Sequence, residues 1–284
     1  MRWQMGRRSS NVEDRRGRSV GVPVVGGGIG MIILAVIIAL LGGDPSIVLD
    51  QASQVTTSAP PSAQIDSPEQ QELVEFVSVV LADTEDTWSQ IFRKMGGNYQ
   101  EPTLVLFTGT VQSGCGYAQA AMGPFYCPLD QKLYIDLSFY DDLKNRHGAP
   151  GDFAQAYVIA HEVGHHVQNL LGISDQVQRM QQRSSKVQAN ELSVRLELQA
   201  DCLAGVWAAY TQQSDNVSLE PGDIEEALNA AASIGDDRLQ KQAQGYAVPD
   251  SFTHGTSAQR VRWFTQGVKT GDPNQCNTFD ARNL

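Results

Sequence analysis

Two histidines four residues apart are the residues of this sequence best suited to hold a metal ion. They lie in the segment His161-Glu162-Val163-Gly164-His165. On a helix with about 100° per residue, His161 and His165 lie about 40° apart around the axis and one turn apart along it, so both imidazoles can reach one ion. Glu162 flanks them, where its carboxylate can take a proton from a water bound to zinc. The spacing therefore predicts a zinc site on a helix.

A hydrolytic zinc site needs a third protein ligand and one open position. Glu197, in the segment Glu197-Leu198-Gln199-Ala200-Asp201, can supply that ligand from a second helix. Asp201 lies one turn later on the same face and can accept the free N–H of a ligand histidine. We therefore expect His161, His165 and Glu197 to bind one Zn²⁺ per chain. Two histidines and one carboxylate suit zinc, although iron uses a similar ligand set.

A glycine inside the motif helix costs roughly 1 kcal/mol relative to alanine, so Gly164 calls for a compensating role. We expect Gly164 and Ala200 to be small so that their two helices can approach closely enough to share one ion. The alternative is that Gly164 is a tolerated defect.

Two other histidines are expected to have structural roles. His166 lies about 140° from His161 around the helix, which favours packing or hydrogen bonding over metal binding. His147 lies in a polar turn flanked by glycine and proline and is expected at the surface.

Capping signals predict the helices that carry the site. The first opens at Asp152, with Gln155 in the capping-box position, and ends at Gly172, a residue suited to follow a helix. The second starts at Ser185, with Gln188 in the corresponding position, and runs to about residue 210.

The remaining elements are expected to form a mainly helical α+β domain with a small sheet. A helix is expected from near Pro68, another from around Pro221, and a last one over residues 257–267. Residues 104–111 and 132–139 have the composition or alternation of strands.

The N-terminal region predicts a membrane anchor. Residues 19–43 carry no charge, and 20–41 would form a helix of roughly 33 Å against a hydrocarbon core of about 30 Å. Residues 1–18 hold six arginines, and by the positive-inside rule we expect them to form a cytoplasmic basic tail. A flexible linker at 44–67 would then lead to an extracytoplasmic domain at 68–284. The alternative, a cleaved signal peptide, lacks an A-x-A-like site.

Charge excludes one class of partner. The net charge is −11, and residues 1–18 contribute +4, so the rest of the chain carries −15. An acidic body repels phosphates, and we therefore expect no nucleic-acid partner.

Four cysteines at positions 115, 127, 202 and 276 allow three pairings. An even count outside the cytoplasm favours disulfides. Proximity in sequence favours Cys115 with Cys127, which leaves Cys202 with Cys276. A cysteine zinc ligand is the weaker alternative, because Cys202 projects about 140° from Glu197 around the helix.

Five motifs resemble those of the bacterial family of neutral zinc metallopeptidases, over roughly Pro68 to the C-terminus. They cover residues 113–116, 123–128, 161–168, 197–205 and 252–255. The resemblance implies a zincin-like fold with a membrane-anchored N-terminus. By similarity to the wider thermolysin class, it also implies that His161, His165 and Glu197 bind zinc, that Glu162 is the general base and that Asp201 supports His161.

The same analogy suggests how a substrate would bind. Zincins place a peptide along an edge strand, for which residues 132–137 are the candidate. His254 is the candidate donor of a hydrogen bond to the oxyanion, with Tyr246 and Arg260 as alternatives. The competing role for His254 is to cap the helix that follows it.

These observations favour a membrane-anchored zinc endopeptidase in which zinc-bound water attacks a peptide carbonyl and Glu162 moves the proton. A zinc-binding scaffold or chaperone-like module of the cell envelope is the alternative from another class. Hydrolysis of a non-peptide amide would use the same residues with a different pocket.

Overall fold

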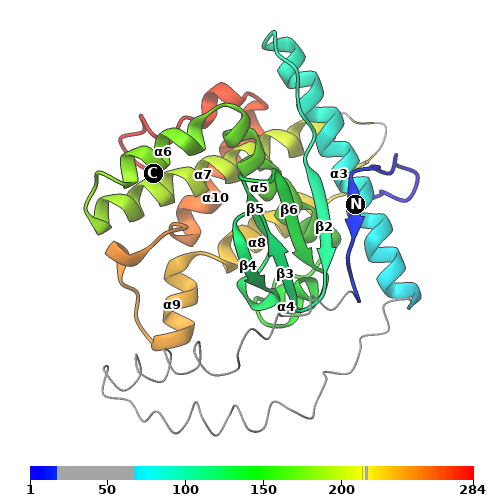
Figure 1. The fold of residues 1–284 in the computed structure, drawn as a ribbon, viewed down its shortest axis with the longest axis horizontal. Helices are drawn as coiled ribbons and strands as arrows, with labels where there is room; N and C mark the ends of the chain where they lie inside the picture. Colours follow the sequence, from blue (N-terminus) through cyan, green and yellow to red (C-terminus); the bar gives the residue numbers. More distant parts are fainter. Residues whose placement is uncertain (18–66, 213, 215–216) are drawn as a thin grey trace, which may run out of the picture.

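The computed structural model describes residues 1–17, 67–212, 214 and 217–284. It is mainly helical with a small sheet, as the sequence predicts (Figure 1). Its elements in chain order are β1 (Val12–Asp14), α3 (Pro68–Lys94), β2 (Thr103–Phe107), β3 (Thr110–Ser113), β4 (Gly116–Gln119), η1 (Ala120–Met122), β5 (Phe125–Cys127), β6 (Lys132–Asp136), α4 (Ser138–Asn145), α5 (Asp152–Leu170), α6 (Ile173–Gln181), α7 (Lys186–Thr211), α8 (Asp223–Ser233), α9 (Asp236–Gln244), η2 (Pro249–Ser251), α10 (Ser257–Thr270) and η3 (Pro273–Cys276).

Helix α5 is the central element of the fold. It contacts the long helix α3, the helices α6, α7 and α8, and strands β5 and β6. Fourteen of its nineteen residues are buried, which explains why its sequence is apolar on nearly every side. A helix surrounded in this way holds its side chains in fixed positions, which suits it to carry a metal site.

The four-stranded sheet has the order β1-β2-β6-β5. Strands β1, β2 and β6 run parallel, and β5 pairs antiparallel with β6. Strand β6 is therefore an interior strand, so the expectation that residues 132–137 form an edge strand was wrong. On the side of β6, the edge strand is β5.

The expected strand over 104–111 is two strands, β2 and β3. The chain turns between them at Gly109, whose φ of +74° favours glycine. The Gly109 N–H donates to Asp136 Oδ2 at 2.7 Å, which fixes the turn against the end of β6. Strand β3 then pairs with β4 in a separate two-stranded sheet.

Both site helices begin where the sequence predicts, but only one of them has the predicted cap. Helix α7 begins after Ser185, which forms a capping box with Gln188 as expected. Helix α5 is preceded by Gly151, with no side-chain cap. The carboxylate of Asp152 instead accepts hydrogen bonds from the Met1 ammonium group. Helices α4, α6 and α9 were not predicted.

Two disulfides join Cys115 to Cys127 and Cys202 to Cys276, which confirms the favoured pairing. The second one ties η3 to α7, close to where α7 crosses α10. At that crossing the two backbones are in contact: a Cβ on Gly267 would lie 2.0 Å from the Cys202 carbonyl oxygen. Small residues therefore hold α10 and the C-terminal segment tightly on α7.

The N-terminal segment differs from the expected separate tail. Residues 1–17 lie beside α3 and β2 (Figure 1), and β1 forms the outer strand of the sheet through its pairing with β2. Trp3 is buried and packs edge-to-face on Phe76 of α3 at 5.3 Å. The segment is thus part of the same folded unit as residues 67–284.

The arginines of this segment pair with acidic groups of the protein itself. Arg7 Nη2 lies 3.0 Å from Glu85 of α3, which is buried and also accepts hydrogen bonds from Ser9 and Asn11. Arg8 pairs with Glu75 on the same helix. Part of the positive charge that was expected in a cytoplasmic tail therefore neutralises acidic side chains of α3.

The expected membrane span at 19–43 lies outside the described residues, as does most of the expected linker at 44–67. In the parts of the chain that the structure describes, no helix is both long and apolar enough to cross a bilayer. Helix α3 begins at Pro68, where the sequence analysis placed the start of the domain.

The packing of the N-terminal segment leads to a stability prediction. Replacing Trp3, which is 7% exposed, with alanine should lower the free energy of unfolding by about 3–5 kcal/mol, because the change leaves a cavity against α3. Replacing Met5, which is 96% exposed, with alanine is the matched control and should change little. Chemical denaturation of the full chain measures both. Equal stability of the two variants would show that the segment is not part of the folded unit.

Candidate metal centre

Three side chains from two helices converge at the proposed zinc site. Helix α5 contributes His161 and His165, and α7 contributes Glu197. His161 Nε2 lies 3.2 Å from Glu197 Oε2, and His165 Nε2 lies 3.4 Å from Glu197 Oε1. The structure thus brings together the three residues that were predicted as ligands.

These distances fit a tetrahedral zinc ion. With zinc–nitrogen and zinc–oxygen distances of about 2.0–2.1 Å, two ligand atoms of a tetrahedral site lie about 3.3 Å apart. The separations of 3.2 and 3.4 Å, which run to the two different oxygens of Glu197, are close to that edge length. Two imidazoles and one carboxylate are also a ligand set typical of catalytic zinc.

The ring nitrogen opposite each proposed ligand atom has its own acceptor. His161 Nδ1–H donates to Asp201 Oδ1 at 2.8 Å, and His165 Nδ1–H donates to Gln168 Oε1 at 2.9 Å. With Nδ1 protonated, the lone pair of a neutral ring is on Nε2, the atom that faces Glu197. Both rings are therefore oriented to bind an ion through Nε2.

Asp201 makes the predicted contact with His161 and has two additional partners. It is fully buried and accepts hydrogen bonds from His161 and from the Tyr157 hydroxyl. It also accepts from two nitrogens of Arg260, both at 2.9 Å. Burial alone would raise the pKa of Asp201, but the charges of Arg260 and His161 lower it to about 2. The residue is therefore a carboxylate under all ordinary conditions.

The negative groups also control the charge of the proposed ligands. Burial opposes the charged form of His161, yet the nearby Asp201 and Glu197 carboxylates raise the pKa of His161 to about 10. Burial likewise opposes the charge of His165, and Glu197 raises its pKa. A site that stabilises positive charge this strongly is electrostatically suited to a divalent cation.

Gly164 has the role that the sequence suggested. A Cβ on this residue would lie 3.0 Å from the Ala200 carbonyl oxygen and 3.3 Å from the Ala200 Cβ. Contacts this short show that α5 and α7 touch through their backbones beside the ligands. The small size of both residues allows the two helices to share one site.

The proposed site opens into a cleft of about 670 Å³. Glu162, the proposed base, lies on its wall with the three ligands and is 8% exposed. Phe125 and Tyr126 of the edge strand β5 also line the cleft, as does His254. The volume is within the range of ligand-binding sites, and one wall is the edge of a sheet.

His254 has the geometry of a hydrogen-bond donor to a bound molecule. Its side chain is 51% exposed, and Nδ1 lies 3.3 Å from Asp236 Oδ1. That hydrogen bond raises the pKa of His254. The competing capping role is excluded, because Thr256 caps α10 in a capping box with Gln259.

The two alternative donors are less suitable. Tyr246 is 62% exposed in the segment after α9 and is absent from the lining of the cleft. Arg260 is 2% exposed, and its guanidinium donates hydrogen bonds to Asp201, Tyr157 and the Ile234 carbonyl.

His166 packs and hydrogen-bonds, as expected. It is fully buried, and its Nε2–H donates to the Gln100 carbonyl at 2.6 Å. Its Nδ1 accepts from the Tyr126 hydroxyl at 2.9 Å, which attaches the edge strand β5 to α5. His147, expected at the surface, is half-buried and lines the cleft.

Two further residues, Tyr157 and Gln168, make contacts at the site and were not predicted. Tyr157 lies four residues before His161, and Gln168 lies three residues after His165. Both therefore lie on the face of α5 that carries the proposed ligands. That spacing was the available signal. Their partners lie on other helices, and the sequence alone does not show which residues those are.

Comparisons with known proteins identify a family and several relatives of this chain. A family model described as "Putative neutral zinc metallopeptidase" matches residues 1–279. A protein of Escherichia coli strain K12, "Uncharacterized protein YpfJ", is 55% identical over 286 residues, which cover 98% of this chain and 99% of that protein. "Uncharacterized protein Rv2575" of Mycobacterium tuberculosis strain H37Rv is 45% identical over 218 residues, or 74% and 73% of the two chains.

No solved structure matches the chain. The family match covers nearly the whole sequence, including the N-terminal segment that carries β1. The chain therefore belongs to the family described as putative neutral zinc metallopeptidases.

Proposed function

We propose that this protein is a zinc-dependent endopeptidase that binds one zinc ion per chain through His161, His165 and Glu197. The observation that carries the proposal is the position of Glu162. Glu162 lines the same open cleft as the three ligands. A purely structural zinc site is closed and does not need a base at the mouth of a cleft.

Zinc, when bound, supplies a Lewis acid that makes water more acidic and polarises a carbonyl group. Glu162 accepts a proton from the attacking water and passes it to the leaving amine, so the reaction needs no covalent acyl-enzyme. His254 donates a hydrogen bond to the carbonyl oxygen as negative charge develops on it. Asp201 and Gln168 keep the two ligand imidazoles in the tautomer that the site requires.

We propose that the substrate binds along β5 rather than along β6. In the described sheet, β5 pairs on one side with β6, so its other edge has backbone groups that a peptide could use. Phe125 and Tyr126 of this strand line the cleft, and Tyr126 is attached to α5 through His166. A peptide added to β5 would therefore pass beside Glu162.

An extracytoplasmic location remains a proposal, and so does contact of residues 19–43 with a membrane. The two disulfides support the location, because disulfides persist in oxidising compartments. A single span at 19–43 would place residues 1–17 and 67–284 on opposite faces of a bilayer. Since β1 pairs with β2, we propose instead that both parts lie on the same side.

The test of the endopeptidase proposal compares wild type with Glu162→Gln, using the full chain because residues 1–17 pack on the domain. Both should bind about one zinc per chain. Wild type should cleave an unstructured protein such as casein, and Glu162→Gln should lose at least 10²-fold in rate, because general-base catalysis contributes roughly 10²–10⁴-fold. Glu191→Gln, an exposed change on α7, is the control and should retain activity.

Two outcomes would contradict the proposal. Cleavage by Glu162→Gln at the wild-type rate would exclude Glu162 as the base. Zinc binding without cleavage of any member of a broad peptide library would favour the envelope scaffold or the amide hydrolase instead.

The position of His254 generates a pH prediction. When Nδ1–H donates to Asp236, only the protonated ring has a second N–H for the substrate, so donation requires the imidazolium. Because Asp236 raises the pKa of His254, this form persists to higher pH than for a free histidine, and activity should fall as pH rises through that pKa. His254→Ala should lower kcat roughly 10²–10³-fold and abolish this alkaline limb.

The pH–rate profile of kcat measures this effect, with Tyr246→Phe as the control that should keep the wild-type profile. Asp236→Asn should move the limb to lower pH, since it removes the charge that stabilises the imidazolium. An alkaline limb that is unchanged in His254→Ala would assign it to another group.

A further inference from the structure

We propose that Gln168 is a positioning residue for the zinc ligand His165, and that Gln199 and the disulfide-bound C-terminal segment hold Gln168 in place. This inference rests on the proposed zinc site and goes beyond it. Through Cys276, the segment η3 would then help to orient the His165 imidazole, although η3 is distant in sequence from every proposed ligand.

The orientation of the Gln168 amide follows from its hydrogen bonds. The side chain is fully buried, and its Nε2 donates to the Leu196 carbonyl at 2.7 Å and to Gln199 Oε1 at 3.1 Å. Both acceptors require the NH₂ group on that side of the amide. Its Oε1 must therefore face His165, whose Nδ1 lies 2.9 Å away. A flipped amide would place oxygen against oxygen on α7 and NH₂ against the imidazole N–H.

Gln199 is fixed by the same reasoning one step further from the site. It is 7% exposed, and its Nε2 donates to the Cys276 carbonyl at 3.0 Å. That bond leaves its Oε1 to face Gln168. The two amides thus form a directional chain in which each donates away from the site and accepts from the site side.

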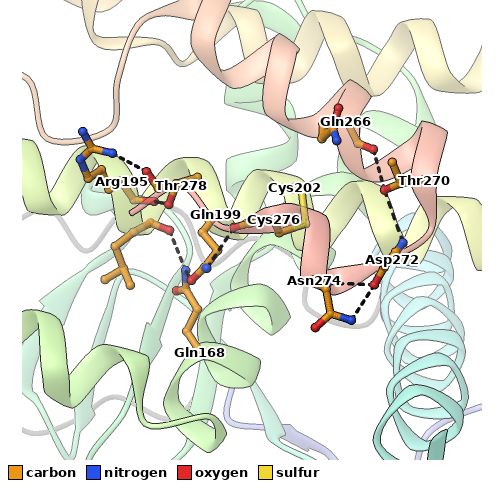
Figure 2. The surroundings of a disulfide bond; sticks show 11 residues. Gln168, Arg195, Gln199, Cys202, Gln266, Thr270, Asp272, Asn274, Cys276 and Thr278 are labelled. Atoms are coloured by element: carbon orange, nitrogen blue, oxygen red, sulfur yellow. Dashed lines mark hydrogen bonds between the residues drawn. A yellow bond between two sulfur atoms is a disulfide. The ribbon is translucent and has the colours of Figure 1, made fainter. Parts of the chain in front are cut away.

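The far end of this chain is anchored by a covalent bond. Figure 2 shows the hydrogen bonds that run from Gln168 through Gln199 to Cys276, and the disulfide that joins Cys276 to Cys202. Two residues further on, the Thr278 hydroxyl donates to the Arg195 carbonyl at 2.6 Å, and the Arg195 guanidinium donates back to the Thr278 carbonyl. The Cys276 carbonyl is therefore held in a fixed position relative to α7.

The network also joins the two helices that supply the ligands. Leu196, whose carbonyl accepts from Gln168, directly precedes the ligand Glu197 on α7. Gln168 lies on α5, one turn after His165. Loss of its amide would free the His165 ring to rotate and would remove the donor from Gln199 Oε1 in a buried hydrogen bond. Both effects act on the geometry of the zinc site.

The test is the zinc affinity of the full chain, measured by competition with a chelator. Gln168→Leu removes the polar groups at similar volume and should weaken zinc binding by 10–100-fold, the usual effect of losing a partner of a ligand histidine. Gln199→Leu should weaken it by a smaller factor, since His165 keeps its direct acceptor. The visible spectrum of the cobalt(II)-substituted protein should change in Gln168→Leu, because it reports ligand geometry directly.

Gln181→Leu is the matched control. Gln181 Nε2 donates to the Ala189 carbonyl and to Ser193 Oγ, which is the same pattern of one backbone and one side-chain acceptor on α7. Neither of these hydrogen bonds goes to a proposed zinc ligand. This variant should bind zinc as wild type does and leave the cobalt spectrum unchanged, even if its stability falls.

The role of the disulfide is tested separately with the double variant Cys202→Ala, Cys276→Ala. It should lose zinc affinity to about the extent of Gln199→Leu. Wild-type affinity in a folded double variant would overturn the contribution of the disulfide. Should the double variant fail to fold, Gln199→Leu alone decides whether the C-terminal segment contributes.

The outcomes separate this inference from the proposed function. Absence of zinc binding by wild type would refute the zinc site itself. Zinc binding by wild type that is matched by Gln168→Leu, with an unchanged cobalt spectrum, would overturn only the positioning role of Gln168.

Discussion

One buried carboxylate, that of Asp201, holds the centre of this protein together. It lies on α7 and binds His161 and Tyr157 of α5 and Arg260 of α10, all away from solvent. A buried ion pair contributes little net stability, but removing one partner typically costs 3–5 kcal/mol, because the other charge is left unpaired. The three helices are therefore constrained to one arrangement, and that arrangement sets the orientation of His161.

A second polar network orients the imidazole of His165, as Asp201 orients that of His161. Gln168 and Gln199 are neutral, so this half of the site is held by directional hydrogen bonds instead of charge. Between the two networks, Gly164 and Ala200 allow α5 and α7 to touch. The distances between the proposed ligand atoms thus follow from three separate features of the helix interface.

The sequence was sufficient to predict the site where the signal is local. The spacing of His161 and His165, and of Glu197 and Asp201, follows from the geometry of a single helix, and the structure brings all four together. The order of strands in the sheet depends on tertiary pairing, and here the prediction was wrong. Alternation along residues 132–137 indicated a strand but not its place inside the sheet, and β5 became visible as the edge only from the strand order.

The N-terminal segment shows the same limit most clearly. Its arginines, followed by an uncharged stretch, have the pattern of a cytoplasmic tail, but the pattern contains nothing about Glu85 or Phe76, with which Arg7 and Trp3 pair on α3. The family match, which includes residue 1, agrees with the inclusion of this segment in the folded unit.

The central claim is that one zinc ion is held by His161, His165 and Glu197, and X-ray absorption spectroscopy of the zinc-loaded full chain tests it most directly. We expect two imidazole nitrogens and additional oxygen ligands at about 2.0–2.2 Å, with loss of one imidazole in His165→Ala. A sulfur ligand near 2.3 Å, or a spectrum that His165→Ala leaves unchanged, would contradict the claim.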